Sequence, residues 1–197
     1  MKTCALALIA VASCLAAPPE ADKGKLLGGL GAPLSIEVYS SFACSHCKDF
    51  HERVLPQIVR DYVVSGKACV ISRETFPPNL QVALEAANYA TAAARIGKYQ
   101  EVGDVLFREQ AAWAVNGRVW ETVASVLTAD QQKRVQALAK DPGVVGEVQA
   151  DQELARQNSV TQTPTLLVTR GAKRYPLPGL PEYSLLRSLL DSMLGAK

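Results

Sequence analysis

Two cysteines stand two residues apart in the segment Cys44-Ser45-His46-Cys47, directly after a short apolar run. Residues 34–39 predict a strand, and residues 48–64 predict a helix. We therefore expect Cys44 at a helix N-terminus, where unpaired backbone N–H groups and the helix dipole favour a thiolate. A thiol with a lowered pKa is a nucleophile at neutral pH, and Cys47, one turn further on, can attack a mixed disulfide formed at Cys44. The spacing suits reversible dithiol–disulfide exchange.

Three other uses of a CxxC pair remain as alternatives. A structural zinc site needs four ligands, and the sequence has no second CxxC and no HxxxH motif. A purely structural disulfide would close so small a loop that it would remove little entropy from the unfolded chain. A copper carrier on a related fold would need a distant histidine, whereas His46 and His51 both stand beside the cysteines. We predict no metal site and no cofactor.

The length and composition indicate one folded domain with room for an inserted subdomain. The chain has 197 residues, of which 48% are hydrophobic and 20% are charged, as is usual for a folded protein with a sizeable core. The formal net charge is only +2, and no cluster of lysine and arginine stands out. These features argue against a nucleic-acid-binding protein.

The first residues have the pattern of a targeting segment. A positive start at Met1-Lys2 precedes an apolar run at residues 5–12 and then small residues, which predicts a signal segment over residues 1–17. The apolar run is too short for a permanent membrane-spanning helix. Export to an oxidising compartment, the bacterial periplasm or cell envelope, agrees with a redox-active CxxC pair.

Two processing sites compete within this segment. Val11-Ala12-Ser13-Cys14 resembles the bacterial lipobox, in which the signal would end at Ser13 and Cys14 would carry the lipid. Ordinary cleavage after Ala16 or Ala17 is the alternative. If Cys14 is lipidated, the segment that follows it tethers the domain to the membrane.

The remaining pattern predicts an α/β order of strand, helix, strand, helical block, two strands and a final helix. Residues 18–33, with two prolines and several glycines, predict a linker. A second strand is expected at 68–74, helices over about 79–158, strands at 164–169 and 173–177, and a closing helix at 181–194. Thr128 and Gln131 have the spacing of a helix N-cap pair.

At this point the chain resembles the DsbA-like thioredoxin-fold family of exported disulfide oxidoreductases. Residues 41–50 resemble its active-site stretch, residues 160–165 resemble its cis-proline loop, and residues 29–39 resemble its lead-in to the first strand. The helical block matches the insertion characteristic of that family. The resemblance implies an α/β thioredoxin fold with an inserted helical subdomain, extending over residues 34–194.

The family's roles transfer to the matching residues. The resemblance implies that Cys44 is the attacking thiol and Cys47 the resolving one, with Ser45 and His46 tuning the pair. It also implies a cis peptide bond before Pro164, which is plausible because proline makes the cis form accessible. Thr163 would then pair its backbone with an extended substrate peptide. For His46, the alternative is an exposed histidine on the helix surface.

Two positions depart from the family pattern. Ser45 stands where the family's CPHC-type motif has proline, and Val38 stands where many relatives have a buried acid six residues before the first cysteine. Glu37 is one residue away, and strand alternation predicts that it points to the other face of the sheet. Proton transfer to or from Cys47 would then use water or another group.

Four further residues receive structural interpretations. Cys69 stands in an apolar strand and is predicted to be a buried inert thiol, with a second redox site as the alternative. His51 is predicted to lie on the helix surface. Trp113 and Trp120 are expected to pack inside the helical block, with a peptide groove as the alternative.

The sequence therefore predicts a thiol–disulfide oxidoreductase that acts on the cysteines of exported proteins or peptides, in the oxidising direction, with a quinone-linked membrane partner as reoxidant. Thr163 before Pro164 supports the alternative of a reductase or isomerase, since relatives of those kinds often have threonine there. The competing class is a non-catalytic peptide-binding envelope domain with a structural disulfide.

Overall fold

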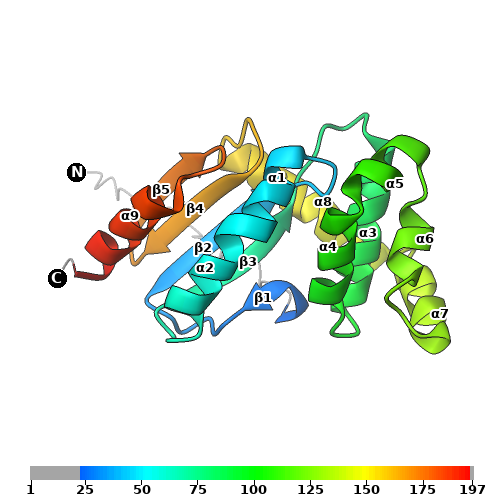
Figure 1. Cartoon of the computed structure of the whole chain (residues 1–197), viewed down its shortest axis with the longest axis horizontal. Coiled ribbons are helices and arrows are strands. Elements are labelled where there is room, and N and C mark those ends of the chain that lie inside the picture. Colours follow the sequence, from blue (N-terminus) through cyan, green and yellow to red (C-terminus); the bar gives the residue numbers. More distant parts are fainter. Residues whose placement is uncertain (1–22, 196–197) are drawn as a thin grey trace, which may run out of the picture.

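The protein folds around a five-stranded mixed sheet (Figure 1). The computed structural model describes residues 23–195. The strands are β1 (Leu26–Leu27), β2 (Leu34–Ser40), β3 (Ala68–Glu74), β4 (Thr165–Arg170) and β5 (Lys173–Pro178). They lie in the order β1-β3-β2-β4-β5, with β2 and β3 parallel and the other neighbours antiparallel. The four predicted strands are confirmed, whereas β1 was not predicted.

The helix that follows the cysteines is continuous but changes its hydrogen-bond register. It consists of α1 (Ser45–Asp49), the π-helical stretch η2 (Phe50–Val54), α2 (Leu55–Ile58) and the π-helical stretch η3 (Val59–Val63). Pro56 has no backbone N–H, and in a regular α-helix its ring would clash with the carbonyl one turn earlier. The π-helical stretch before α2 accommodates this proline within the helix that the sequence predicted.

The two faces of the sheet pack against different helices. Leu34, Ile36 and Val38 of β2 share one core with α2 and with α9 (Tyr183–Gly195); Figure 1 shows these helices on the near side of the sheet. The neighbouring Tyr39 points the other way and packs against α8 (Pro142–Gln157). Residues of β2 therefore alternate between the two faces, as the period of a strand requires.

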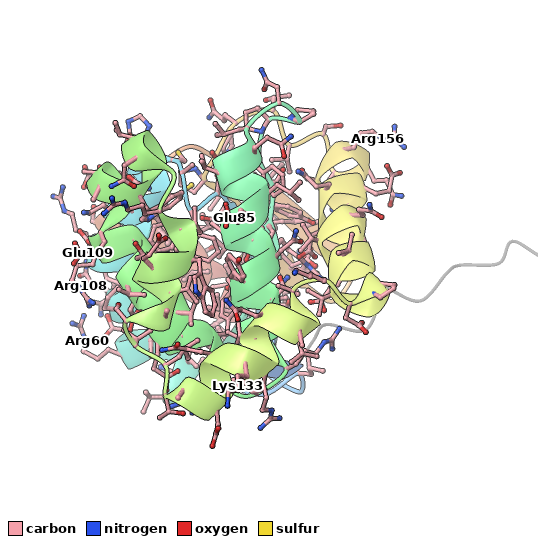
Figure 2. The ribbon with its side chains drawn as sticks, turned by 90° about the vertical axis from the view of Figure 1, so that its right-hand side faces the viewer. Arg60, Glu85, Arg108, Glu109, Lys133 and Arg156 are labelled. Carbon is pink, nitrogen blue, oxygen red and sulfur yellow. The ribbon has the colours of Figure 1, made fainter. Side chains whose placement is uncertain are left out.

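A helical block fills the chain between β3 and β4. Its helices are, in chain order, α3 (Gln81–Ala94), α4 (Tyr99–Arg108), α5 (Gln110–Asn116), α6 (Val119–Ala124), α7 (Ala129–Leu138) and α8. Figure 2 faces this block and shows α3 at its centre, with Arg108, Lys133 and Arg156 projecting outward near its margin. The predicted block over about 79–158 corresponds to these helices, and the predicted cap of α7 by Thr128 and Gln131 is present as a reciprocal capping box.

The helical block has its own core, and the active-site segment contributes to it. Trp113 is fully buried there, and its Nε1 donates to the Leu106 carbonyl at 2.7 Å. Trp120 packs against Tyr89 with ring centroids 5.1 Å apart, so both tryptophans pack the block as predicted. Phe42 and Cys47 are buried in the same cluster. The segment that holds the cysteines therefore lies at the junction of the sheet and the block.

The linker prediction is wrong for residues 23–27. Lys23–Lys25 forms a short 3-10 helix, η1, and the next two residues form β1 against β3. The Lys25 side chain is 2% exposed, and its Nζ lies 2.5 Å from Asp151 Oδ2. The local sequence is rich in glycine, which indicates a linker, but it carries no sign of an ion pair with a helix more than a hundred residues later.

The two edges of the sheet differ. β1 pairs with Val70 and Ile71 at one edge. β5 forms the other edge and is exposed along most of its length. It contains Pro176 and Pro178, which have no N–H to donate.

The signal segment 1–17, Cys14 and the first residues of the predicted linker lie outside the described residues. Between residues 23 and 195, no helix is both long and apolar enough to cross a membrane.

The close packing of η1 gives a stability prediction. A Cβ on Gly24 would contact the Ala94 carbonyl oxygen and lie 2.8 Å from the Ala94 Cβ. Gly24→Ala is expected to lower the free energy of unfolding in urea by about 1–3 kcal/mol, the usual cost of overpacking. Gly29→Ala is the matched control, because a Cβ there has no atom within 4 Å. Equal unfolding midpoints for the two variants would contradict the packing of η1 against α3.

Candidate active site

Cys44 is the residue that immediately precedes the first turn of α1. Its backbone is extended (φ −95°, ψ 123°). Its N–H donates to the Ser41 carbonyl at 3.1 Å, and its own carbonyl accepts from the N–H groups of Cys47 and Lys48, each at 3.1 Å. The side chain of Cys44 is half-buried, whereas that of Cys47 is buried. The predicted position of Cys44 at a helix N-terminus is confirmed.

The surroundings of Cys44 favour its thiolate. Hydrogen bonding from the Cys47 thiol is the largest cause that lowers the pKa of Cys44, to about 5. Partial burial opposes this shift, while the Thr163 side chain and the N–H groups of Cys47 and His46 reinforce it. Because this pKa lies well below neutral, Cys44 carries a thiolate at neutral pH and is the nucleophile of the pair.

Cys47 has the opposite character. Its hydrogen bond to the Cys44 sulfur and its burial raise its pKa well above the ordinary thiol value. The Ser41 N–H lies 3.4 Å from its Sγ, and its side chain has no solvent exposure. The pair therefore shares one proton, which Cys47 keeps while Cys44 is ionised.

The loop before β4 lies against Cys44. The Thr163–Pro164 peptide bond is cis, as predicted. Cys44 Sγ lies 3.4 Å from the Thr163 carbonyl oxygen, although the two residues are 119 positions apart. Pro164 is buried, and its carbonyl accepts from the Gly179 N–H at 2.8 Å. The structure thus brings together a half-exposed nucleophilic sulfur, a buried thiol and a cis-proline loop.

A family model described as Thioredoxin matches residues 20–174, which is most of the chain. The chain belongs to the thioredoxin family.

Solved structures of DsbA proteins share its fold. Wolbachia pipientis alpha-DsbA1 matches with a TM-score of 0.74 and 24% identity, over 92% of this chain and 94% of that one. Oxidised BdbD from Bacillus subtilis matches with a TM-score of 0.74 and 18% identity, over 88% and 95% of the two chains. Pseudomonas aeruginosa DsbA2 matches with a TM-score of 0.68 and 21% identity, over 90% of this chain and 96% of that one. The predicted thioredoxin fold with an inserted helical subdomain is confirmed.

The sequence relatives are longer proteins that match over only part of their length. A Rickettsia felis protein provisionally named as a protein-disulfide oxidoreductase is 22% identical over 105 residues. The match covers 53% of this chain and 37% of the relative. A Rickettsia prowazekii protein with the same kind of name is also 22% identical over 105 residues, with 38% of its length covered. This thioredoxin-family chain therefore matches little more than a third of these relatives.

The two residues between the cysteines are exposed. Ser45 and His46 both point to solvent on the first turn of α1. The described contribution of His46 to the Cys44 sulfur comes from its backbone N–H, whereas the sequence drew attention to its ring. Their predicted tuning roles stay predictions.

The departure predicted at the buried-acid position is present. Val38 is 5% exposed in the apolar core beneath the active-site helix. Glu37 points to the other face, where its Oε1 accepts from Arg73 at 2.9 Å. The same arginine also donates to Asp151 of α8 at 3.1 Å.

Gln110 is a site residue that the sequence did not reveal. Its side chain is buried, and its Nε2 donates to the carbonyl oxygens of Phe42 at 2.6 Å and Cys44 at 3.0 Å. This amide joins the first residue of α5 to the segment that enters α1. A glutamine in a helical region gives no local signal of such a contact, because its partners lie more than sixty residues earlier.

His51 lies on the helix surface, but it is partly covered and has partners there that were not predicted. Its Nε2 lies 2.7 Å from Asp104 Oδ1, and its ring packs on Phe107 with centroids 4.6 Å apart. The side chain is only 17% exposed, because α4 of the helical block packs over this face of the helix. His51 therefore joins η2 to α4.

Cys69 is 1% exposed in β3, and burial raises the pKa of its thiol. This agrees with the predicted inert, buried thiol. Over the described part of the chain, no group of three or more His, Cys, Asp or Glu side chains is arranged to hold a metal ion.

The hydrogen bond between the two thiols gives a prediction for their titration. The thiolate absorbance of the reduced protein is expected to rise in one step with a midpoint near pH 5. In Cys47→Ala the midpoint should move to higher pH, because the largest cause of the lowered pKa is lost. Cys69→Ala is the control and should leave the midpoint in place. An unchanged midpoint in Cys47→Ala would show that Cys47 does not stabilise the Cys44 thiolate.

Gln110 gives a second prediction, with a matched control in the helical block. Gln132 makes the same kind of contact, donating to the carbonyls of Ala124 and Leu127 at 3.0 Å each. We expect Gln110→Ala and Gln132→Ala each to lower the free energy of unfolding by about 1–3 kcal/mol, because the first removes the donor to the Phe42 carbonyl and the second removes the donor to the Leu127 carbonyl. Only Gln110→Ala should also shift the titration of Cys44, measured by thiolate absorbance, because only Gln110 holds the segment from Phe42 to Cys44 that precedes α1. Equal Cys44 titration in both variants would limit Gln110 to a role in stability.

Proposed function

We propose that this protein is a thiol–disulfide oxidoreductase that exchanges disulfides with cysteines of exported proteins, acting as an oxidant. The observation that supports this most directly is the difference between the two cysteines. One sulfur is half-exposed with a pKa lowered to about 5, and the other is buried with a raised pKa. A structural disulfide needs no such difference.

The oxidising cycle begins with the Cys44–Cys47 disulfide. A substrate thiolate attacks Cys44 Sγ, which is the half-exposed sulfur, and the S–S bond breaks with its electron pair on Cys47. Cys47 then takes up a proton. The substrate's second thiolate attacks its own sulfur in the mixed disulfide, and Cys44 leaves as a thiolate. The substrate has lost two electrons, and the cysteine pair has gained them.

The direction follows from the stability of the leaving thiolate. A Cys44 pKa of about 5 means that the reduced protein is stabilised at neutral pH relative to one with ordinary thiols. This contribution is fully present above the ordinary thiol pKa and is lost as the pH falls through about 5. A stabilised reduced form makes the disulfide a stronger oxidant.

The substrate is proposed to bind in extended form beside Cys44. Thr163 precedes the cis-proline and contacts the Cys44 sulfur, so its backbone is suited to pair with a peptide strand, and the exposed Ser45 would border the same peptide. We further propose export through the segment 1–17, with lipidation of Cys14 as one form of anchoring. The electrons gained in each cycle would pass to a quinone-linked membrane reoxidant.

The redox equilibrium of the Cys44–Cys47 pair against glutathione tests both the activity and its direction. We expect a potential near the oxidising end, about −120 mV as for DsbA, rather than about −270 mV as for thioredoxin. A thioredoxin-like value would favour the reductase or isomerase alternative, which Thr163 before Pro164 supports.

Cys44→Ser is the control for this measurement and should exchange with neither glutathione nor a peptide dithiol. If the unaltered protein also fails to exchange but still binds peptides, the non-catalytic peptide-binding domain is the better description, and the oxidoreductase proposal is wrong.

A further inference from the structure

A row of polar side chains interrupts the apolar face of the sheet beneath the active-site helix. Ser40 is the last residue of β2 and is paired in register with Glu74, the last residue of β3. Partners in register share a face of the sheet, and this face is the one on which Val38 and Val70 pack under the helix. Glu74 therefore lies on the same side of the sheet as Cys47.

Ser40 connects this row to the buried thiol. Its side chain hydrogen-bonds the Cys47 sulfur and favours the thiolate there, against the burial that raises the pKa of Cys47. Cys47 is otherwise enclosed by the apolar core of the helical block. A proton that leaves or reaches its sulfur thus meets the Ser40 hydroxyl as a neighbouring polar group.

A small cavity joins Ser40 to Glu74. Its volume is about 30 Å³, and it is partly open to solvent. Besides apolar side chains, it is lined by Ser40, His51, Ser72, Glu74, Tyr99 and Gln100. A cavity of this size has room for about one or two water molecules, and its polar lining groups could hydrogen-bond them. Ser40, whose hydroxyl contacts Cys47, and Glu74 therefore line one cavity that is large enough to hold water.

Glu74 is buried, and groups from several elements set its ionisation. The Tyr99 hydroxyl of α4 donates to its Oε1 at 2.7 Å. Burial opposes its ionised form most strongly, Lys25 of η1 favours that form, and Asp151 and Glu147 of α8 oppose it. The pKa of Glu74 is raised to about 7. Near neutral pH both its protonated and its ionised forms are populated.

We propose that Glu74 is the proton-exchanging residue for Cys47, acting through the Ser40 hydroxyl and water in the adjoining cavity. This rests on the proposed function and deepens it. When a substrate thiolate breaks the Cys44–Cys47 bond, the Glu74 carboxyl gives up a proton and the Cys47 thiolate becomes a thiol. When Cys47 attacks a mixed disulfide at Cys44, the Glu74 carboxylate takes the proton back, and no electrons move to or from Glu74. Glu74 is thus a positioning residue that supplies the acid missing at Val38.

The test follows the second of these steps in isolation. A mixed disulfide of glutathione on Cys44 is prepared, and release of glutathione by Cys47 is followed as a function of pH. In the unaltered protein the rate should rise through an inflection near pH 7, as the Glu74 carboxylate forms. In Glu74→Gln this inflection should vanish, and the rate above it should fall by about 10- to 100-fold, toward the lower end of what a positioned base contributes.

Glu85→Gln is the matched control. Glu85 is also a carboxyl with a raised pKa and a hydrogen-bonded tyrosine, Tyr89, but it lies on the outer side of α3, as Figure 2 shows. Its replacement should leave the pH profile unchanged. A general effect of replacing a carboxyl that is hydrogen-bonded to a tyrosine would change both profiles.

Tyr99→Phe and Ser40→Ala keep the test decisive if Glu74→Gln folds poorly. Loss of the Tyr99 donor should raise the pKa of Glu74 and move the inflection to higher pH. Ser40→Ala should slow release, and adding Glu74→Gln to it should slow release little further, because both act on one path.

The outcomes separate the two proposals. The role of Glu74 would be overturned if Glu74→Gln released glutathione with an unchanged pH profile, or if the inflection did not move in Tyr99→Phe. Either result would leave the proposed oxidoreductase function unaffected. Failure of Cys44 to form or resolve any mixed disulfide would overturn both.

Discussion

The carboxylate of Asp151 lies where three parts of the chain meet, and their arrangement depends on it. Its oxygens accept from Lys25 of η1, from Arg73 of β3 and from the backbone N–H of Glu74. All of these groups are buried, and removing one partner of such a set leaves uncompensated charge that costs about 3–5 kcal/mol. The network therefore fixes α8 to the sheet and the first described residues to both.

The difference between the two cysteines follows from where the helical block is held. The thioredoxin sheet and its helix supply Cys44 with an N-terminal position, while the block encloses Cys47 and, through Gln110, holds the segment between Phe42 and Cys44. The two cysteines of one short segment thus differ in ionisation. Cys44 faces the cis-proline loop, whereas Cys47 is buried in the core of the helical block.

The parts of this structure that were predictable are those with local patterns. A few neighbouring residues are enough to recognise each of these features: the CxxC pair before a helix, the Thr163–Pro164 dipeptide and the alternating strands. Glu74, Gln110 and Lys25 cannot be recognised in this way, since their importance depends on strand register and on which helix packs over which loop. The partners of His51 were not predictable for the same reason, because the sequence does not tell which face of the helix α4 covers. The register that pairs Ser40 with Glu74 is a property of the fold alone.

The edges of the sheet have a consequence for association between molecules. A strand with free N–H and C=O groups at an edge is a template for a strand from another chain. On one side, the two-residue strand β1 pairs with the middle of β3. At the end of β3, the N–H of Glu74 donates to the Asp151 side chain. On the other, β5 presents two prolines and the exposed cations Lys173 and Arg174. A very short edge strand on one side and prolines with exposed cations on the other disfavour strand addition, so growth of the sheet between molecules is disfavoured at both edges of the described fold.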